Sequence, residues 1–340
     1  MGRPAAVVRA IVTGGGGFLG AALAQKLRER GDEVRVFGRG SYAELEAIGI
    51  DCARGDITDY EALKAACDDR DVVFHAAAKV GLGGRYEDFH SVNVEGTKNV
   101  LRACLAHGIR KLVFTSSPSV VFHGGDMEGV NESAPYPEKF DSFYSQTKAL
   151  SEQMVLAADH DKLATVSLRP HLIWGPGDRN LLPRVVARRK AGRLFRIGDD
   201  NKLVDTIYVD DAVSAHVMAA VQLAPRSEIS GKAYFLSGGD PRPIWEIVDR
   251  MLGAAGLGPV KKRMSKPLAY GLASACEGAW RVLGLSSEPP ATKFLVDALT
   301  TAHWFDISAA KRELGWRPEV KIEDGMSRVS HWIAATRRND

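Results

Sequence analysis

The chain has 340 residues, 45% of them hydrophobic and 26% charged, which is typical of a globular protein with one or two domains. Lys and Arg number 45 against 42 Asp and Glu, and the net charge of +3 is too small to indicate a nucleic-acid partner. The 4 cysteines form no CxxC pair and no zinc-type spacing, so we expect neither disulfides nor a metal. The longest apolar stretch, 267–276, is too short to span a bilayer, and we expect a cytoplasmic protein.

Short apolar runs alternate with segments of helical spacing through the first half of the chain. Strands are expected at 7–13, 33–37, 71–76, 111–115 and 164–169, with one more ahead of Gly55, and helices at 18–30, 60–67, 92–107 and 143–158. This alternation predicts an α/β fold of the Rossmann type, a doubly wound parallel sheet with helices on both faces. After residue 169 the rhythm breaks, with helices expected at 210–223, 243–252 and 307–314 and a strand at 233–236.

A glycine-rich segment, TGGGGFLG, lies between the first strand and the first helix. Gly14, Gly17 and Gly20 are spaced by three residues, which permits a tight turn and a close approach of the backbone to a pyrophosphate. The helix that begins at Phe18 and Leu19 offers free N–H groups to that anion. The segment predicts a dinucleotide cofactor, and a flexible turn without a ligand is the alternative.

The end of the second strand selects between the two nicotinamide cofactors. An acid about twenty residues past the glycine loop would bind the ribose hydroxyls of NAD and repel a 2′-phosphate. Here Gly38 stands in that place and Arg39 follows, and a guanidinium binds phosphate bidentately. We therefore predict NADP, with NAD as the alternative if Arg39 is only a solvated charge. Asp56, followed by Ile57, is placed after the third strand to accept the adenine amino group.

Three side chains have the chemistry of a general acid/base site. Tyr144 and Lys148 lie one turn apart on an expected helix, and an ammonium near the phenol would lower its pKa from near 10. Ser117 follows the fifth strand, at the sheet edge where ligands bind, and can hydrogen-bond the same substrate oxygen. Ser116 and Ser119 are competing hydroxyls, and capping a loop is the alternative role for each serine.

Together these motifs resemble the extended short-chain dehydrogenase/reductases over almost the whole chain. The resemblance rests on TGGGGFLG (13–20), GDITD (55–59), HAAA (75–78), NVEGT (93–97), FTSS (114–117), YSQTK (144–148), LRPHLIWGPGD (168–178), YVDD (208–211) and FDISAAKRELGWRP (305–318). It implies that Ser117, Tyr144 and Lys148 are catalytic and that Asn93 orders the region beneath the nicotinamide. The resemblance also implies cofactor contacts at Ala76, Ala77, Lys79, Thr115 and Pro170. These add to the glycine loop, Arg39, Asp56, Ile57, Tyr144 and Lys148.

Within that family the sequence is most similar to the 3β-hydroxysteroid dehydrogenase branch. Segments 36–59, 171–184 and 289–306 resemble bacterial reductases of 2-alkyl-3-oxoalkanoic acids, and 119–124 and 168–171 resemble sterol 4α-carboxylate 3-dehydrogenases. Both implied substrates carry a 3-oxo or 3-hydroxy group, a carboxylate one carbon away and a large hydrocarbon body. We predict an NADP-dependent oxidoreductase that interconverts the 3-oxo and the 3-hydroxy group. The first candidate substrate is a 2-alkyl-3-oxoalkanoic acid, and the alternative is a 3β-hydroxysteroid or sterol acid.

The sequence also suggests substrate contacts. A substrate carboxylate needs a cation, and each candidate has an ordinary surface role as its alternative. The candidates are Lys79, Arg85, His171 and Arg184. Ser119 is a further candidate substrate contact. The apolar residues of 264–305 form either a cap over a hydrophobic substrate, resting on a membrane or a lipid enzyme, or ordinary core.

We expect an NADP-binding domain at 1–170, to which part of 200–235 returns, and a mainly substrate-binding lobe at 171–340. The helices after the fourth and fifth strands are expected to form a homodimer seam. Two other functions stay open. A non-catalytic NADP sensor has the same fold but would tolerate loss of the tyrosine and lysine pair. A nucleotide-sugar epimerase would need residues that bind the diphosphate of its substrate, and the apolar C-terminal lobe offers no obvious ones.

Overall fold

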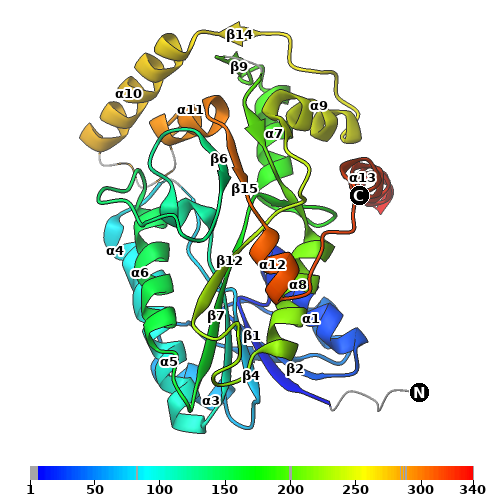
Figure 1. The fold of residues 1–340 in the computed structure, drawn as a ribbon. Helices are drawn as coiled ribbons and strands as arrows, with labels where there is room; N and C mark the ends of the chain where they lie inside the picture. The colour runs from blue at the N-terminus through cyan, green and yellow to red at the C-terminus, as the bar shows by residue number, and fades with distance from the viewer. Residues whose placement is uncertain are drawn as a thin grey trace.

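A seven-stranded parallel sheet forms the centre of the molecule, in the order β12–β7–β5–β4–β1–β2–β3 (Figure 1). The computed structural model describes residues 7–339 apart from 82, 199, 200, 284, 286 and 288, with side chains through residue 336. The strands are β1 Arg9–Thr13, β2 Glu33–Gly38, β3 Asp51–Arg54, β4 Val72–His75, β5 Lys111–Thr115, β7 Ala164–Pro170 and β12 Lys232–Leu236. The predicted doubly wound sheet is confirmed.

Helices cover both faces of this sheet. On one face α1 Phe18–Glu29 packs against α8 Val209–Gln222, and on the other α5 Gly96–His107 packs against α3 Tyr60–Ala66 and α6 Phe143–Ala157 (Figure 1). Successive side chains of a strand point to opposite faces. In β1, Ala10 and Val12 accordingly join the buried cluster that holds Leu23, whereas Ile11 joins the cluster that holds Val100.

A smaller group of elements follows the carboxyl ends of β5 and β7. Its four-stranded sheet has the order β13–β10–β15–β6, and two further strand pairs are β11 with β8 and β14 with β9. These strands are β6 Met127–Val130, β8 Ile173–Trp174, β9 Arg196–Ile197, β10 Leu203–Val204, β11 Ile207–Tyr208, β13 Arg242–Pro243, β14 Arg263–Met264 and β15 His303–Phe305. The helices are α7 Leu181–Lys190, α9 Ile244–Ala254, α10 Lys266–Val282, α11 Lys293–Thr300, α12 Ser308–Glu313 and α13 Ile322–Asn339.

The chain crosses between the two groups more than once. β6, from the first half of the sequence, pairs with β15, while β12 and α8 return to the large sheet from the second half. The short helices α2 Ala43–Glu46 and α4 Tyr86–Phe89 lie in loops. None of the helices in the described ranges is both long and apolar enough to cross a membrane.

One predicted helix differs in its first turns. The segment expected at 92–107 is a regular α-helix only from Gly96, because His90–Glu95 form a π-helical turn. Such turns are frequent at functional sites. Asn93 lies within this turn.

Candidate active site

The glycine-rich loop joins β1 to α1 where the strand order reverses, since β1 lies between β2 and β4. Gly14 has a φ of +73°, and a Cβ there would lie 2.7 Å from the backbone of Ala77. A Cβ on Gly20 would overlap the Gly14 carbonyl. α1 has Gly17 as its N-cap and no side-chain cap, so its first N–H groups point to the loop. The loop therefore has the space and the donors that a dinucleotide pyrophosphate requires.

The ends of β2 and β3 carry the residues predicted for the adenosine end. Asp56 accepts hydrogen bonds from the backbone N–H and the hydroxyl of Thr58, at 2.9 and 2.8 Å. The backbone hydrogen bond lowers the pKa of Asp56, and the charge of Arg39 acts in the same direction. Arg39 itself is exposed. Ile57 is buried beside them.

Asn93 joins the loop after β4 to the helix that bears the catalytic candidates. Its Oδ1 accepts from the Lys79 backbone N–H at 2.7 Å, and its Nδ2 donates to the Lys79 carbonyl at 3.1 Å. The same Nδ2 donates to the Thr147 hydroxyl at 3.0 Å. Asn93 therefore holds the loop that contains Ala76, Ala77 and Lys79 against α6.

The structure brings Ser117, Tyr144 and Lys148 to the carboxyl end of β5. α6 begins after Ser142, whose hydroxyl caps it, so Tyr144 lies in the first turn and Lys148 in the second. Ser117 follows β5 and is the N-cap of the short helix Pro118–Val121, and its hydroxyl acts to lower the pKa of the Tyr144 phenol. The Lys148 Nζ donates to the Thr115 carbonyl at 2.6 Å and lies 3.9 Å from the centre of the Phe114 ring.

The electrostatics of this trio differ from the prediction. Burial raises the pKa of the Tyr144 phenol, and the hydrogen bond with Ser117 only partly opposes this shift. Burial also lowers the pKa of Lys148 to about 7, against the opposing attraction of Glu152. The expectation that Lys148 lowers the pKa of the phenol is therefore wrong for this structure, because the ammonium is desolvated and directed to Thr115. The phenol keeps its proton at neutral pH.

A buried ion pair that sequence analysis missed fixes this helix. Glu152, one turn after Lys148, is fully buried and accepts from the Arg169 Nη2 at 2.7 Å. It also accepts from the hydroxyls of Ser167 at 2.6 Å and Tyr136 at 2.8 Å. Burial alone would raise the pKa of Glu152, but the hydrogen bonds and charge of Arg169 hold it below its usual value. An arginine in an otherwise uncharged strand was the available signal.

The other predicted contacts lie in different environments. Thr115 shares a 2.9 Å hydrogen bond with His216 Nε2, so its hydroxyl is engaged within the protein. Pro170 is buried at the end of β7. The Ser119 hydroxyl is buried and has no hydrogen-bond partner among the described residues. It lies next to Ser117, whose Oγ accepts from the Ser119 backbone N–H at 3.2 Å.

Of the cations proposed for a substrate carboxylate, His171 is corrected by the structure. Its Nδ1 lies 2.6 Å from the Asp205 carbonyl, and burial lowers its pKa well below the usual value, so the ring is neutral. Lys79 and Arg85 both pair with Asp88, at 4.0 and 3.1 Å. Arg184 lies exposed on α7.

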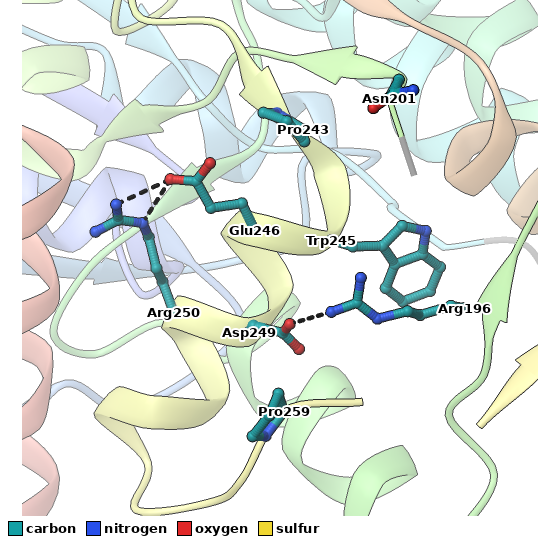
Figure 2. Close-up of a pocket in the computed structure, with 8 residues that line it drawn as sticks. All are labelled: Arg196, Asn201, Pro243, Trp245, Glu246, Asp249, Arg250 and Pro259. Carbon is teal, nitrogen blue, oxygen red and sulfur yellow. Dashed lines mark hydrogen bonds and ion pairs between the residues drawn. The ribbon is translucent and has the colours of Figure 1, made fainter. Parts of the chain in front are cut away.

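A cavity of about 630 Å³ lies elsewhere, beside α9, and none of the predicted site residues lines it. Figure 2 shows its charged groups directed at one another, with Arg196 paired to Asp249 and Arg250 paired to Glu246. These pairs neutralise charge within the cavity wall. The catalytic candidates are thus separate from this cavity.

Residues 11–266 match the model of the 3-beta hydroxysteroid dehydrogenase/isomerase family. The chain belongs to this family. It is 46% identical over 330 residues to a 2-alkyl-3-oxoalkanoate reductase of Stenotrophomonas maltophilia, and the match covers 96% of this chain and 100% of the relative. A 2-alkyl-3-oxoalkanoate reductase of Shewanella oneidensis is 45% identical over 96% of this chain and 86% of its own length. The human sterol-4-alpha-carboxylate 3-dehydrogenase, decarboxylating, is 34% identical over 97% of this chain and 89% of its own length.

Solved structures share the fold along almost the whole chain. An epimerase of Methanothermobacter thermautotrophicus aligns with a TM-score of 0.78 at 24% identity, over 99% of this chain and 95% of its own. A UDP-glucose 4-epimerase of Thermus thermophilus, in complex with NAD, aligns with a TM-score of 0.74 at 23% identity, over 96% and 99%. The family membership confirms the predicted resemblance. Because the similar proteins in this family are named reductases, this chain is an oxidoreductase that acts on CH–OH groups.

The buried ion pair generates a stability prediction. Replacing Glu152 with Gln keeps the size of the side chain but leaves Arg169 buried without a counter-charge, which should lower the free energy of unfolding by about 3–5 kcal/mol. Urea denaturation at pH 7 measures the loss. Glu323→Gln, which breaks the half-exposed contacts of Glu323 with Arg242 and Arg250, is the matched control and should cost far less. Equal losses in the two variants would show that the buried pair contributes nothing special.

Lys148 should make stability depend on pH above neutrality. Its pKa is about 7 in the folded protein against a reference of 10.5, so the unfolded chain binds more protons between those values. The free energy of unfolding should therefore rise with pH across this window, by an amount that is absent from the Lys148→Met variant. Urea titrations of both proteins at pH 7, 8.5 and 10 measure the difference. Parallel pH profiles would contradict the lowered pKa.

Proposed function

We propose that this chain is an NADP-dependent oxidoreductase that interconverts the 3-oxo and 3-hydroxy groups of a large hydrophobic acid, with a 2-alkyl-3-oxoalkanoic acid as its first candidate substrate. The observation that carries the proposal is that Ser117, after β5, and Tyr144, in the first turn of α6, lie at the carboxyl edge of the sheet, where the Ser117 hydroxyl acts on the pKa of the phenol. It occurs in a chain that is 46% identical to a 2-alkyl-3-oxoalkanoate reductase along almost its whole length.

The proposed roles follow from the protonation states. Bound NADPH would supply the hydride to the substrate carbonyl carbon. The Tyr144 Oη donates its proton to the carbonyl oxygen, and its raised pKa keeps that proton in place at neutral pH until the oxygen becomes basic. Ser117 hydrogen-bonds the same oxygen and orients it. Lys148 is held at the base of the site by its hydrogen bond to the Thr115 carbonyl, and its role is to bind the nicotinamide ribose.

The cofactor contacts are proposed from their positions at the sheet edge. Gly14, Gly17, Phe18, Leu19 and Gly20 hold the pyrophosphate, while Arg39, Asp56 and Ile57 contact the adenosine end. On the nicotinamide side the proposed contacts are Ala76, Ala77, Lys79, Asn93, Thr115, Tyr144, Lys148 and Pro170. On this basis residues 1–170, with β12 and α8 returned from 200–235, form the NADP-binding domain. Residues 171–340 form mainly the substrate lobe.

The proposed substrate contacts are one buried hydroxyl and three cationic side chains. The Ser119 hydroxyl, buried without a partner among the described residues, is available to a substrate oxygen. With His171 neutral, Lys79, Arg85 and Arg184 are the candidates for the carboxylate. A sterol 4α-carboxylate is the second candidate substrate, favoured by the human relative that aligns over 97% of this chain.

Two contacts with other molecules complete the proposal. α5 and α6 pack side by side and expose Leu105 and Leu150, which suits the predicted homodimer seam. α10 exposes Leu268, Leu272 and Val282, which suits a peripheral contact with a lipid surface or a lipid enzyme. Sedimentation velocity and vesicle flotation test the two contacts separately.

Turnover should depend on the phenolic proton. Tyr144→Phe removes only the hydroxyl, so we expect kcat to fall by about 10²–10⁴-fold while the Kd for NADPH stays within about twofold. Steady-state kinetics with a 2-alkyl-3-oxoalkanoic acid and fluorescence titration of the cofactor measure the two quantities. Phe143→Leu, one residue away on the exposed side of α6, is the control and should leave kcat unchanged. Full activity in Tyr144→Phe would place the proton donor elsewhere.

Substrate preference should follow hydrocarbon length. Each buried methylene contributes about 0.8 kcal/mol, so kcat/KM should rise about fourfold per added carbon until the pocket is full. A series of 2-alkyl-3-oxo acids of increasing chain length, assayed with NADPH, measures the slope. A 4α-carboxysterol, assayed for oxidation with NADP and NAD, is the comparison substrate. Activity on the sterol acid alone would replace the first candidate with the second, and a flat series would remove the hydrocarbon pocket.

A further inference from the structure

Tyr42 stands over three glycines at the adenosine end of the crevice. It directly precedes α2, and its ring lies against Gly16 of the glycine-rich loop and against Gly38 and Gly40 after β2. A Cβ on Gly40 would lie 2.9 Å from the Tyr42 ring, and a Cβ on Gly16 or Gly38 would lie closer still to the Tyr42 side chain. The Gly40 N–H donates to the Tyr42 Oη at 3.1 Å. The phenol is therefore held in place by packing and by one hydrogen bond.

The three glycines serve to make room for this ring. Gly14 needs glycine for its positive φ, but Gly16, Gly38 and Gly40 have backbone angles that other residues adopt. What glycine supplies at these three positions is the missing Cβ. The phenol of Tyr42 fills the space in which their side chains would stand.

We propose that Tyr42 takes the place of the acid that ends the second strand of NAD-binding sheets, and that its hydroxyl donates to the 2′-phosphate of NADP. The proposal rests on the proposed function, since it presumes that a nicotinamide dinucleotide lies along the glycine-rich loop. The Tyr42 Oη accepts from Gly40 and so keeps its own proton for a ligand, and none of the described residues takes that proton. A neutral donor binds a phosphate that a carboxylate would repel.

The same packing sets the present position of the Tyr42 phenol against any side chain at position 38. The Cβ of Gly38→Asp would overlap the Tyr42 hydroxyl, so the phenol must move from its present position to accommodate an acid there. The single substitution therefore loses the proposed phosphate donor and leaves a displaced ring beside the ribose. Removing the ring as well, in Gly38→Asp/Tyr42→Ala, opens the space that an acid needs to reach the ribose hydroxyls.

Fluorescence titration of the dissociation constants for NADPH and NADH tests this assignment. Tyr42→Phe keeps the ring in its seat and should weaken NADPH about tenfold while changing NADH less than about twofold. Gly38→Asp should weaken both cofactors, and Gly38→Asp/Tyr42→Ala should bind NADH more tightly than NADPH. Thermal melting of each protein without cofactor checks that the variants fold. Arg39→Ala is the matched control, because it removes the other phosphate candidate without touching the ring.

The outcomes separate the two proposals. An NADPH loss in Arg39→Ala with none in Tyr42→Phe overturns the role of Tyr42 and leaves NADP as the cofactor. Recovery of NADH binding by Gly38→Asp alone, without the second substitution, also overturns it, since the ring would then not exclude the acid. Equal affinities for the two cofactors in the unsubstituted protein overturn the NADP preference and the role of Tyr42 together.

Discussion

The buried ion pair of Glu152 and Arg169 is the constraint on which the candidate active site depends. Two desolvated charges are stable only when they are paired and hydrogen-bonded, and Glu152 satisfies this with Arg169, Ser167 and Tyr136. The pair locks α6 onto β7 and so fixes which face of α6 meets the sheet edge. Lys148 lies one turn before Glu152 and Tyr144 one turn before that, on the same face. Displacement of the pair would therefore displace both.

That pair also acts on the pKa of Lys148, against the larger effect of burial. An ammonium in a buried site loses its proton readily, and the Glu152 carboxylate is the group that opposes this loss. The neighbouring row of α6 is held independently, since Thr147 accepts from Asn93 and the Ser151 hydroxyl donates to the Asn93 carbonyl. The side of α6 that bears Glu152 thus acts on the charge of Lys148. The side that bears Thr147 and Ser151 holds the helix against Asn93 and, through Asn93, against the loop after β4.

The sequence predicts most of the large sheet well because strands such as β1, β4 and β5 are short, mainly apolar runs whose side chains are buried. The glycine-rich loop is visible because it lies between a predicted strand and a predicted helix, and the trio of Ser117, Tyr144 and Lys148 is visible through the family resemblance together with its place at strand and helix ends. Long-range partners are not visible in this way. β6 pairs with β15 from the far end of the chain, Glu152 resembles a surface residue of a helix, and the direction of the Tyr144 pKa shift is set by burial of the phenol. The role of Gly38 likewise depends on Tyr42, whose ring no local pattern places there.

Electrostatics along the crevice follow from how its carboxylates are held. Glu152 is neutralised by Arg169 inside the protein and presents no free negative charge, whereas Asp56 remains a carboxylate whose hydrogen bonds from Thr58 hold its pKa low. At the end of β2, where an acid would stand, the ring of Tyr42 excludes one by volume. Because α1 begins at the glycine-rich loop, an anionic ligand there meets the favourable dipole of the helix N-terminus, and Arg39 attracts the nearby carboxylate of Asp56. The position of the Tyr42 phenol therefore acts on ligand charge through packing, because a phosphate at the end of β2 meets a hydroxyl where an acidic side chain would otherwise stand.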